Sequence, residues 1–509
     1  MATPSESRSS ERDEPVVVSS SDELRERVAG IAGAVTAAVL DAIGPTLPTT
    51  AEAFAGLERR LERVGTAQLV GPVVECVLRE LHESERFTKS AVAEAAETRP
   101  LTVQGRRNVA VATVQGGVAT VDTPYARPPR PKGSRPGRRK GVGRRGPSGS
   151  GCYPVLAKLG FLGRTSPLLT SSVARAAAEL SSYAEARESL ASRGVQLDLK
   201  GVRLIAHRFA DAGLEARRAL EDAPETRELE GKRAVVLFDG GRVRTRVSGK
   251  RGRRREATGR RGYSTPWREP VLVVVYLVDE NGKKTKDRPW YEGTLAGWDA
   301  AFGIAVDLLR RLGARHARQL VIAGDGANAI WDRVDDLVGA TGIRRSRVRL
   351  FADFWHAVEH LHEVAQLVKS WTPDERVRWV RARRRQLFEG RVEAVVDAIR
   401  EHAVGRNAKK IEREAAYFES REHLMRYDEL RAEGLPIGTG AVESAVRRVV
   451  NLRMKGPGIF WEEPNAERML LLRCRLKAGR WDELERDAYS QAAATFGRVL
   501  EAERRASDS

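Results

Sequence analysis

Three short apolar runs in the middle of the chain, each followed within two residues by an aspartate, limit its fold more than any other feature. Apolar, β-branched runs of four to eight residues between turn residues are typical of buried strands. The runs and their aspartates are Ala234–Phe238 with Asp239, Gln319–Ala323 with Asp325, and Val348–Phe351 with Asp353. The sequence therefore predicts a β-sheet that holds carboxylates where its strands end.

The segments between these runs predict the rest of an α/β core. Val271–Val278 is a continuous apolar run that ends in the turn sequence Asp-Glu-Asn-Gly, as expected of a further buried strand. A helical pattern follows from about Trp298 to Leu312. This order of strands and helices predicts a mixed β-sheet flanked by helices. Because 509 residues suffice for about three domains, the whole chain is expected to be multidomain and α-rich.

The charge of the chain indicates a polyanionic partner. The formal net charge is +19 and the isoelectric point about 10.2, which favours nucleic acid over a membrane surface. Arg127 to Arg145 holds nine basic residues and no acid, and Arg242 to Arg261 holds ten against a single acid. A solvated, flexible arm is the alternative for either run. The candidate phosphate contacts in the second run are Arg253, Arg254 and Arg255.

The sequence gives no sign of secretion or membrane insertion. Its longest unbroken apolar stretch, Val271–Val278, is far shorter than the roughly 20 residues that span a bilayer. The N-terminus is polar and acidic and lacks the regions of a signal peptide. Three widely spaced cysteines, Cys76, Cys152 and Cys474, argue against disulfides and structural zinc. These features predict a cytoplasmic protein.

Changes of pattern divide the chain into successive segments. The first half is expected to comprise a disordered tail at 1–20, a helical region at 21–98, a β-hairpin at 99–126, a basic Pro/Gly linker or arm at 127–151 and a helical region at 152–230. The second half is expected to comprise the α/β core from 231 to 369, a helical insertion at 370–430, a return to the core at 431–480, and a C-terminal helix and tail at 481–509.

The helical region at 152–230 contains a candidate helix-turn-helix. Two short helical patterns are separated by a turn around Arg193-Gly194, and Asp198 is expected to cap the second. Such a second helix would suit docking in the major groove of DNA, although helix pairs of this kind are common in α proteins. The side chains expected to face DNA are Lys200, Arg203, His207 and Arg208.

A third carboxylate, Glu443, joins Asp239 and Asp325 as a candidate metal ligand. It lies on a predicted helix that follows a glycine-flanked loop, where Thr439 is expected to be the N-cap. Three carboxylates can hold two divalent metal ions, which prefer oxygen ligands. Taken alone, an Asp-Gly at the end of a strand is usually a turn residue. The predicted apolar stripe of the helix is Val442, Ala445, Val446 and Val449, with Glu443, Arg447 and Asn451 on the other side.

Residues from about 150 to 480 resemble bacterial insertion-sequence transposases of the ISKra type, both in the residues of their motifs and in the order of those motifs. The motifs that carry the resemblance are GCYPVLAKLGFLGRTSPLL, DGG after a strand, WREPVLVVVYLVDENG, VIAGDGANAIW, LFADFWHAVEHL and LPIGTGAVESAVRRVVNLRMKGPGIFW. The resemblance implies a DDE enzyme with a ribonuclease H-like catalytic core. It also implies that Asp239, Asp325 and Glu443 are the catalytic triad and hold two Mg²⁺ ions, with Mn²⁺ able to substitute.

The resemblance also implies the reaction and the partners. Water activated by metal would cut the phosphodiester at the transposon end, and the freed 3′-hydroxyl would attack target DNA. The partners would be double-stranded DNA, as inverted-repeat ends and as target, bound by a homodimer or larger assembly in the bacterial cytoplasm at the nucleoid. The spacing of 118 positions from Asp325 to Glu443 and the helical pattern at 370–430 predict the helical insertion. A domesticated, catalytically silent DNA-binding protein is the alternative.

The segment from Asp353 to His362 admits three interpretations. His360-Leu361-His362 matches the His-hydrophobic-His motif of single-strand nickases. The apolar stripe of the segment, however, indicates a helix, on which residues two apart diverge by about 200°. His360 and His362 therefore cannot bind one metal ion, as the nickase interpretation requires. His356, Glu359 and His360 match the H-x-x-E-H motif of zinc peptidases but lack an identified third ligand. We favour Asp353 and His356 as an accessory pair near the triad, with a purely structural pair as the equal alternative.

The segment after Glu443 is basic and then aromatic. A cationic helix face followed by Phe460 and Trp461 would suit contacts to the DNA backbone and stacking on a splayed base. Core aromatics that close the helix are the alternative. The basic candidates are Arg447, Arg448, Arg453 and Lys455.

Overall fold

The computed structural model of the chain describes residues 22–43, 69–98, 100–129, 151–248, 263–326 and 328–492. The chain splits into two compact units, one of Met1–Arg218 with Asp482–Ser509 and one of Ala219–Trp481. The predicted tail at 1–20, most of the basic arm, and Arg253, Arg254 and Arg255 lie outside the described residues.

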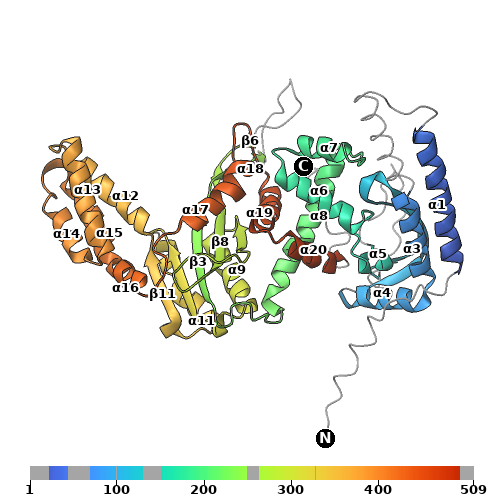
Figure 1. Cartoon of the computed structure of the whole chain (residues 1–509), viewed down its shortest axis with the longest axis horizontal. Coiled ribbons are helices and arrows are strands. Elements are labelled where there is room, and N and C mark those ends of the chain that lie inside the picture. Colours follow the sequence, from blue (N-terminus) through green and yellow to red (C-terminus); the bar gives the residue numbers. More distant parts are fainter. Residues whose placement is uncertain are drawn as a thin grey trace, which may run out of the picture. The chain divides into compact units, whose positions relative to one another are not determined.

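The first unit combines helices with one β-hairpin (Figure 1). Strand β1 (Thr102–Ala112) pairs antiparallel with β2 (Val118–Arg127), which confirms the predicted hairpin. Between them Gly116 adopts a φ of 80°, a conformation that favours glycine. The helices of this unit are α1 (Asp22–Ile43), α3 (Gly71–Glu83), α4 (Glu85–Thr98), α5 (Pro154–Lys158), α6 (Pro167–Glu179), α7 (Tyr183–Ala191), α8 (Leu199–Arg218) and α20 (Trp481–Ser490).

The predicted helix pair corresponds to α7 and α8. Asp198 caps α8 as expected, since its Oδ1 accepts a hydrogen bond of 2.6 Å from the backbone N–H of Gly201. Residues 192–198 connect the two helices, and this is longer than the three- to four-residue turn of a helix-turn-helix.

The DNA-contact candidates on α8 differ in exposure. Lys200 and Arg203 are exposed, and Arg208 is half-buried. His207 is buried, with its ring edge-on to Tyr183 at 6.2 Å. The prediction that His207 faces DNA is therefore wrong, because this position of the helix lies on the packed side.

A mixed five-stranded sheet forms the centre of the second unit, as predicted (Figure 1). The strand order is β11-β10-β3-β8-β9, with β3 parallel to β10, β10 parallel to β11, and β8 antiparallel to both β3 and β9. The strands are β3 (Arg233–Gly240), β8 (Val271–Val278), β9 (Trp290–Thr294), β10 (Gln319–Gly324) and β11 (Val348–Ala352).

Helices cover the sheet, which explains why its strands read as continuous apolar runs. On one face α9 (Trp298–Arg311) and α11 (Val334–Thr341) enclose a large hydrophobic core cluster. There the rings of Phe238 and Phe302 stack with centroids 4.2 Å apart. The helix that carries Glu443, α17 (Gly440–Val446), contacts β3 and β8 and continues through a π-helical turn (Arg447–Asn451) into α18 (Leu452–Met454). Helix α19 (Glu463–Ala478) contacts β9.

A group of helices separates β11 from α17 in the sequence. It covers the predicted helical insertion at 370–430 and packs around side chains such as Leu387, Val395 and Phe418. Figure 1 draws α13, α14 and α15 side by side, in agreement with their contacts. The helices are α12 (Phe354–Leu367), α13 (Pro373–Phe388), α14 (Val392–Arg400), α15 (Ala408–Ser420) and α16 (Tyr427–Ala432).

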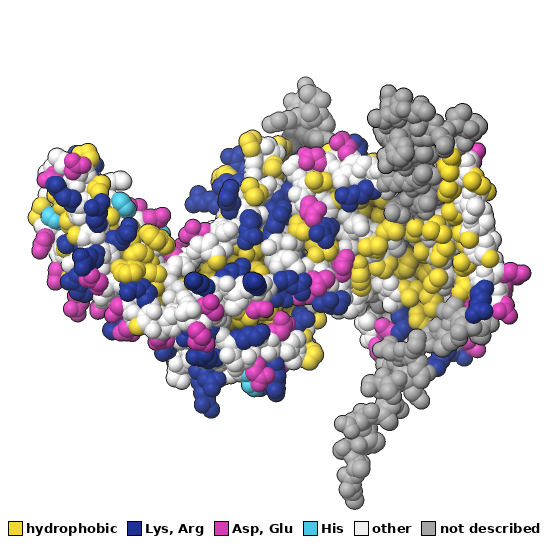
Figure 2. All heavy atoms as spheres, viewed as in Figure 1, with side chains coloured by type: hydrophobic (Ala, Val, Ile, Leu, Met, Phe, Trp, Pro, Cys, Tyr) yellow, Lys and Arg dark blue, Asp and Glu magenta, His cyan; other side chains and the backbone are white. Residues whose placement is uncertain are grey.

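Basic side chains gather on part of the surface. Figure 2 shows Lys and Arg over the region of α18 and the short strand β6 (Tyr263–Ser264), which belong to the second unit. Across the described ranges, no helix combines the length and apolar character needed to cross a membrane.

Candidate active site

The register of the sheet brings the strand-end aspartates together. Ala323 on β10 lies opposite Leu237 on the parallel strand β3, so Asp325 and Asp239 occupy equivalent positions two residues later. In the same way, Gly324 lies opposite Ala352 on β11, which aligns Asp325 with Asp353. Neighbouring strands are about 4.8 Å apart, so three aspartates follow three adjacent strands at the same edge.

The carboxylates of this edge act on one another electrostatically. Burial raises the pKa of Asp239 to about 6, and Asp325, Glu443 and Glu269 add to the increase through their negative charge. A hydrogen bond from the backbone N–H of Gly240 opposes it. Asp239 therefore lies within electrostatic range of Asp325 and Glu443, and also of Glu269 from the W-R-E-P sequence before β8.

Helix α17 presents Glu443 to this edge because its other side is buried. The predicted stripe of Val442, Ala445, Val446 and Val449 is buried, while Glu443 and Arg447 are exposed. Gly241 allows the close approach, since a Cβ there would lie 3.3–3.4 Å from side-chain atoms of Pro270 and Val450. Burial raises the pKa of Glu443, as do the charges of Asp353 and Glu359.

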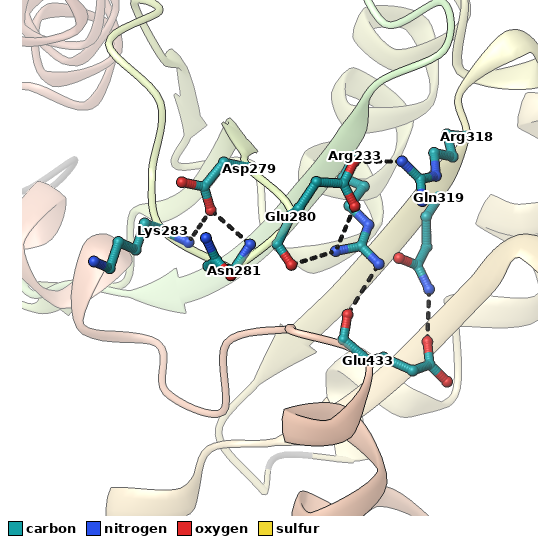
Figure 3. A network of polar contacts seen from close by, with 8 residues as sticks. All are labelled: Arg233, Asp279, Glu280, Asn281, Lys283, Arg318, Gln319 and Glu433. Atoms are coloured by element: carbon teal, nitrogen blue, oxygen red, sulfur yellow. Dashed lines mark hydrogen bonds and ion pairs between the residues drawn. The ribbon is translucent and has the colours of Figure 1, made fainter.

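The chain that leads into α17 is anchored to the opposite ends of the parallel strands (Figure 3). Glu433, just after α16, accepts a hydrogen bond of 2.9 Å from Arg233 through its carbonyl oxygen and one of 2.9 Å from Gln319 through its carboxylate. Arg349 forms an ion pair of 2.9 Å with the same carboxylate. These contacts from β3, β10 and β11 determine where the chain returns from the helical insertion to the core.

Asp353 anchors the other end of this connection. Its side chain is 2% exposed, and its Oδ1 accepts a hydrogen bond of 2.7 Å from the backbone N–H of His356 at the start of α12. Its Oδ2 accepts hydrogen bonds from the backbone N–H and, at 2.5 Å, from the hydroxyl of Thr439. Asp353 therefore joins α12 to α17 within the protein. Thr439 precedes α17 as predicted but does not cap it with its side chain.

His356 lies beside the carboxylates. Its imidazole is half-exposed, with Nδ1 3.3 Å from Glu359, and it counteracts the increase in the pKa of Glu443. Its ring meets the ring of His360 edge-on at 4.9 Å. Within the described ranges, the ligand atoms that converge on His360 come from two glutamates and not from His356. This geometry does not favour the peptidase alternative.

Tyr417 of α15 and Arg421, which directly follows this helix, contact the loop after Asp325, although the sequence did not single them out. Arg421, directly after α15, donates hydrogen bonds of 2.9 and 2.7 Å to the carbonyl oxygen of Gly326. The ring of Tyr417 lies against Gly326 so closely that a Cβ there would be 2.3 Å from its Cε2. Nothing local indicates these contacts, because α15 lies more than 80 residues further along the chain.

The basic segment after Glu443 is only partly exposed. Arg447 and Lys455 are exposed, whereas Arg448 is half-buried and donates a hydrogen bond of 2.7 Å to the hydroxyl of Tyr291. Arg453 is buried beside the ring of Trp461, at 5.3 Å from its centroid. The Arg453 side chain is therefore part of the packing around α18 and does not lie at the surface, where it could contact DNA.

Trp461 is also part of this packing. It is 7% exposed, and its Nε1–H donates a hydrogen bond of 2.9 Å to the carbonyl oxygen of Met454. Its predicted role in stacking on a base is wrong for this arrangement, and the alternative of a core aromatic is correct. Phe460 is half-buried and lies 6.2 Å from Tyr263, centroid to centroid.

Two other aromatic side chains are exposed beside basic residues, as the sequence predicted for Trp461. Trp267 and Tyr263 are 47% and 48% exposed. The guanidinium of Arg244 lies 4.8 Å from the ring centroid of Trp267, and that of Arg246 lies 4.3 Å from Tyr263. The Lys455 ammonium is 6.0 Å from the ring of Trp267. This surface combines cations and aromatic faces.

No family model matches the chain, and neither a curated protein nor a solved structure gives a significant match to it. The function is therefore inferred from the residues of the site and their surroundings.

Proposed function

We propose that this chain is a DDE-type transposase that binds the ends of an insertion sequence, cuts them and joins the 3′-hydroxyl ends to target DNA. The observation that carries the proposal is the carboxylate cluster. Asp239 and Asp325 follow adjacent parallel strands, and Glu443 on α17 is close enough to raise the pKa of Asp239. Rigid strand ends are suited to holding carboxylates at the spacing that phosphoryl-transfer metals need.

The donor set fits two divalent cations, Mg²⁺ with Mn²⁺ able to substitute. Asp239, Asp325 and Glu443 would hold them, since hard cations take oxygen ligands. Burial is the main cause of the raised pKa of Asp239, and the negative charges of Asp325 and Glu443 add to it. A cation would balance those charges, which supports the fit. Bound metals of this kind activate the attacking oxygen and stabilise the leaving oxygen of a phosphodiester.

The surrounding fold is compatible with the ribonuclease H-like core that the resemblance to ISKra-type transposases implies. Its mixed sheet has helices on its faces, and a helical insertion precedes the helix of Glu443. In this proposal, Asp353 and the Glu433 contacts act as positioning groups that keep α17 over the strand ends.

The DNA backbone would be bound by the basic surface next to α17. Exposed Arg447 and Lys455 would contact phosphates, and Trp267 and Tyr263 would offer faces for unpaired bases. Arg253, Arg254 and Arg255 would be further phosphate contacts of the same unit, and Lys200 and Arg203 on α8 would be phosphate contacts of the other unit. Two chemically equivalent ends must be paired, so a homodimer or larger assembly on DNA is expected, at the nucleoid of a bacterial cytoplasm.

The test is strand cleavage of element-end DNA in Mg²⁺ by the full chain and by three variants, Asp239→Asn, Asp325→Asn and Glu443→Gln. We expect each variant to bind the DNA as the parent chain does and to lose cleavage by at least about a thousandfold, since each removes a metal ligand. Glu429→Gln is the matched control, because Glu429 is an exposed acid on α16 that pairs only with Arg426 among the described contacts.

Two results would count against the assignment. Full cleavage by all three variants would remove the carboxylates from the mechanism. Tight DNA binding by the parent chain with no cleavage in Mg²⁺ or Mn²⁺ would instead support a catalytically silent DNA-binding protein.

A further inference from the structure

A second group of metal-binding side chains lies away from the strand ends, where α12 packs on α15. His360 and Glu363 are three residues apart and so share one face of α12. Glu414 reaches the same place from α15. The two helices contact each other, and the ring of Phe418 on α15 lies 6.4 Å from the ring of His360 on α12, centroid to centroid. The three polar residues therefore lie on a rigid helix pair.

The donor atoms of these side chains converge. One ligand atom from each of His360, Glu363 and Glu414 lies within 4.8 Å of the others, and Nδ1 of His360 is 2.7 Å from Oε2 of Glu414. The side chains of His360 and Glu414 are only 21% and 14% exposed. The ring of Tyr417 stacks on the His360 ring with centroids 3.8 Å apart, which restricts the orientation of the imidazole.

A hydrogen bond between His360 and Glu414 does not account for the whole group. Two carboxylates face one imidazole, so the cluster is negatively charged whether or not the histidine is protonated. No contact recorded for the described residues pairs the carboxylate of Glu363 with a cation. A divalent cation between the three donors would balance this charge and use each of them.

The chemistry of the donors selects the class of metal. Mg²⁺ prefers oxygen ligands and keeps much of its water, whereas imidazole nitrogen with carboxylate oxygens suits Zn²⁺. Three protein ligands leave a position for water, as in other three-ligand zinc sites. We propose that His360, Glu363 and Glu414 bind one zinc ion that links α12 to α15.

Such a link between α12 and α15 would also affect the carboxylate site at the strand ends. Helix α15 carries Tyr417, and Arg421 follows it, and both contact Gly326 beside Asp325. A metal that joins α15 to α12 would hold this contact in place. The zinc site does not depend on the proposed transposase activity, because its evidence is the converging donors.

The test is zinc binding by the metal-stripped full chain, measured by isothermal titration with Zn²⁺ and by metal content after dialysis. We expect one zinc per chain, with the Kd weakened by more than about tenfold in His360→Gln and in Glu363→Gln. Glu363 is exposed, so its conservative variant should fold normally. His362→Gln is the matched control, since His362 is an exposed histidine of the same helix that points elsewhere.

An Asp325→Asn variant separates this site from the strand-end carboxylates. We expect it to retain the zinc that His360→Gln and Glu363→Gln lose. The proposal would be overturned by no stoichiometric zinc in the folded parent chain, by equal zinc affinity in the parent and both site variants, or by loss of zinc only in Asp325→Asn. None of these readouts uses DNA cleavage, so failure here leaves the proposed function untouched.

Discussion

Arg421 donates two hydrogen bonds to the carbonyl oxygen of Gly326, the residue that follows Asp325. A third, of 2.6 Å, goes from its Nη2 to the side-chain oxygen of Asn328. The helical insertion thus contacts the core at the loop that carries one of the clustered carboxylates. The insertion is more than a spacer between Asp325 and Glu443, because it contributes contacts to the site.

Arg421→Ala tests this contact. The variant loses charge-assisted hydrogen bonds to Gly326, so we expect unfolding free energy to fall by about 1.5–3 kcal/mol and strand cleavage to fall more than DNA binding. Urea unfolding and cleavage as a function of Mg²⁺ concentration are the measurements. Arg426→Ala is the control, because Arg426 is exposed and pairs with Glu429. Equal cleavage by the parent chain and Arg421→Ala would show that the loop does not need this support.

The Asp353–Thr439 contact predicts a difference between two substitutions. Thr439→Val removes the hydroxyl and leaves a buried carboxylate oxygen with one donor fewer, which should lower the free energy of unfolding by about 1–3 kcal/mol. Thr439→Ser keeps the hydroxyl and should therefore lower the free energy of unfolding by less than Thr439→Val does. Urea unfolding of both variants and of the parent chain measures this. If Val and Ser cost the same, the hydroxyl contributes nothing to holding α17.

The raised pKa of Asp239 predicts how stability depends on pH in the metal-free protein. A carboxyl whose pKa rises from 3.8 to about 6 on folding binds its proton more tightly in the folded state, so its contribution to stability is present at low pH and is lost as pH rises through 6. The Asp239→Asn variant has no ionisable carboxyl at this position, so its stability does not fall in this way as the pH rises. We expect it to be more stable than the parent chain by about 1–3 kcal/mol at pH 7.5, and by less at pH 4.5.

Urea unfolding in EDTA at the two pH values is the measurement for Asp239→Asn. Adding Mg²⁺ should reduce the advantage of the variant at pH 7.5, because a bound cation stabilises the ionised carboxylate. A parent chain as stable as Asp239→Asn at pH 7.5 in EDTA would be inconsistent with crowded carboxylates.

Two tryptophans near the basic surface should respond in opposite ways to substitution. Trp267 is exposed beside Arg244, so Trp267→Ala should weaken binding of single-stranded DNA by about 1–3 kcal/mol and barely change stability. Trp461 is buried, so Trp461→Ala should lower unfolding free energy by about 3–5 kcal/mol. Fluorescence anisotropy and thermal unfolding measure the two effects. Weakened stability without weakened binding in Trp267→Ala would refute the assignment of this surface.

Several features of the core could be predicted from local sequence. The apolar runs before Asp239 and Asp325 gave the correct strands, and alternation around Gly116 gave the hairpin, because strand and turn preferences act over a few residues. Glu443 was correctly placed on a helix with one buried side, since helical periodicity is also local. These patterns specify which residues face inward within an element.

Whether a polar or aromatic side chain remains available to a ligand depended on distant parts of the chain. The sequence suggested Asp353 as an accessory group. In the structure, however, one of its carboxylate oxygens accepts a hydrogen bond from Thr439, 86 residues later in the chain. Trp461 and Trp267 each follow a basic segment of the sequence, yet Trp461 is buried and Trp267 is exposed. The strands, the helix of Glu443 and the excess positive charge follow from local sequence. Which charged groups meet is a property of the tertiary fold, because burial and pairing depend on elements that are brought together from far apart in the chain.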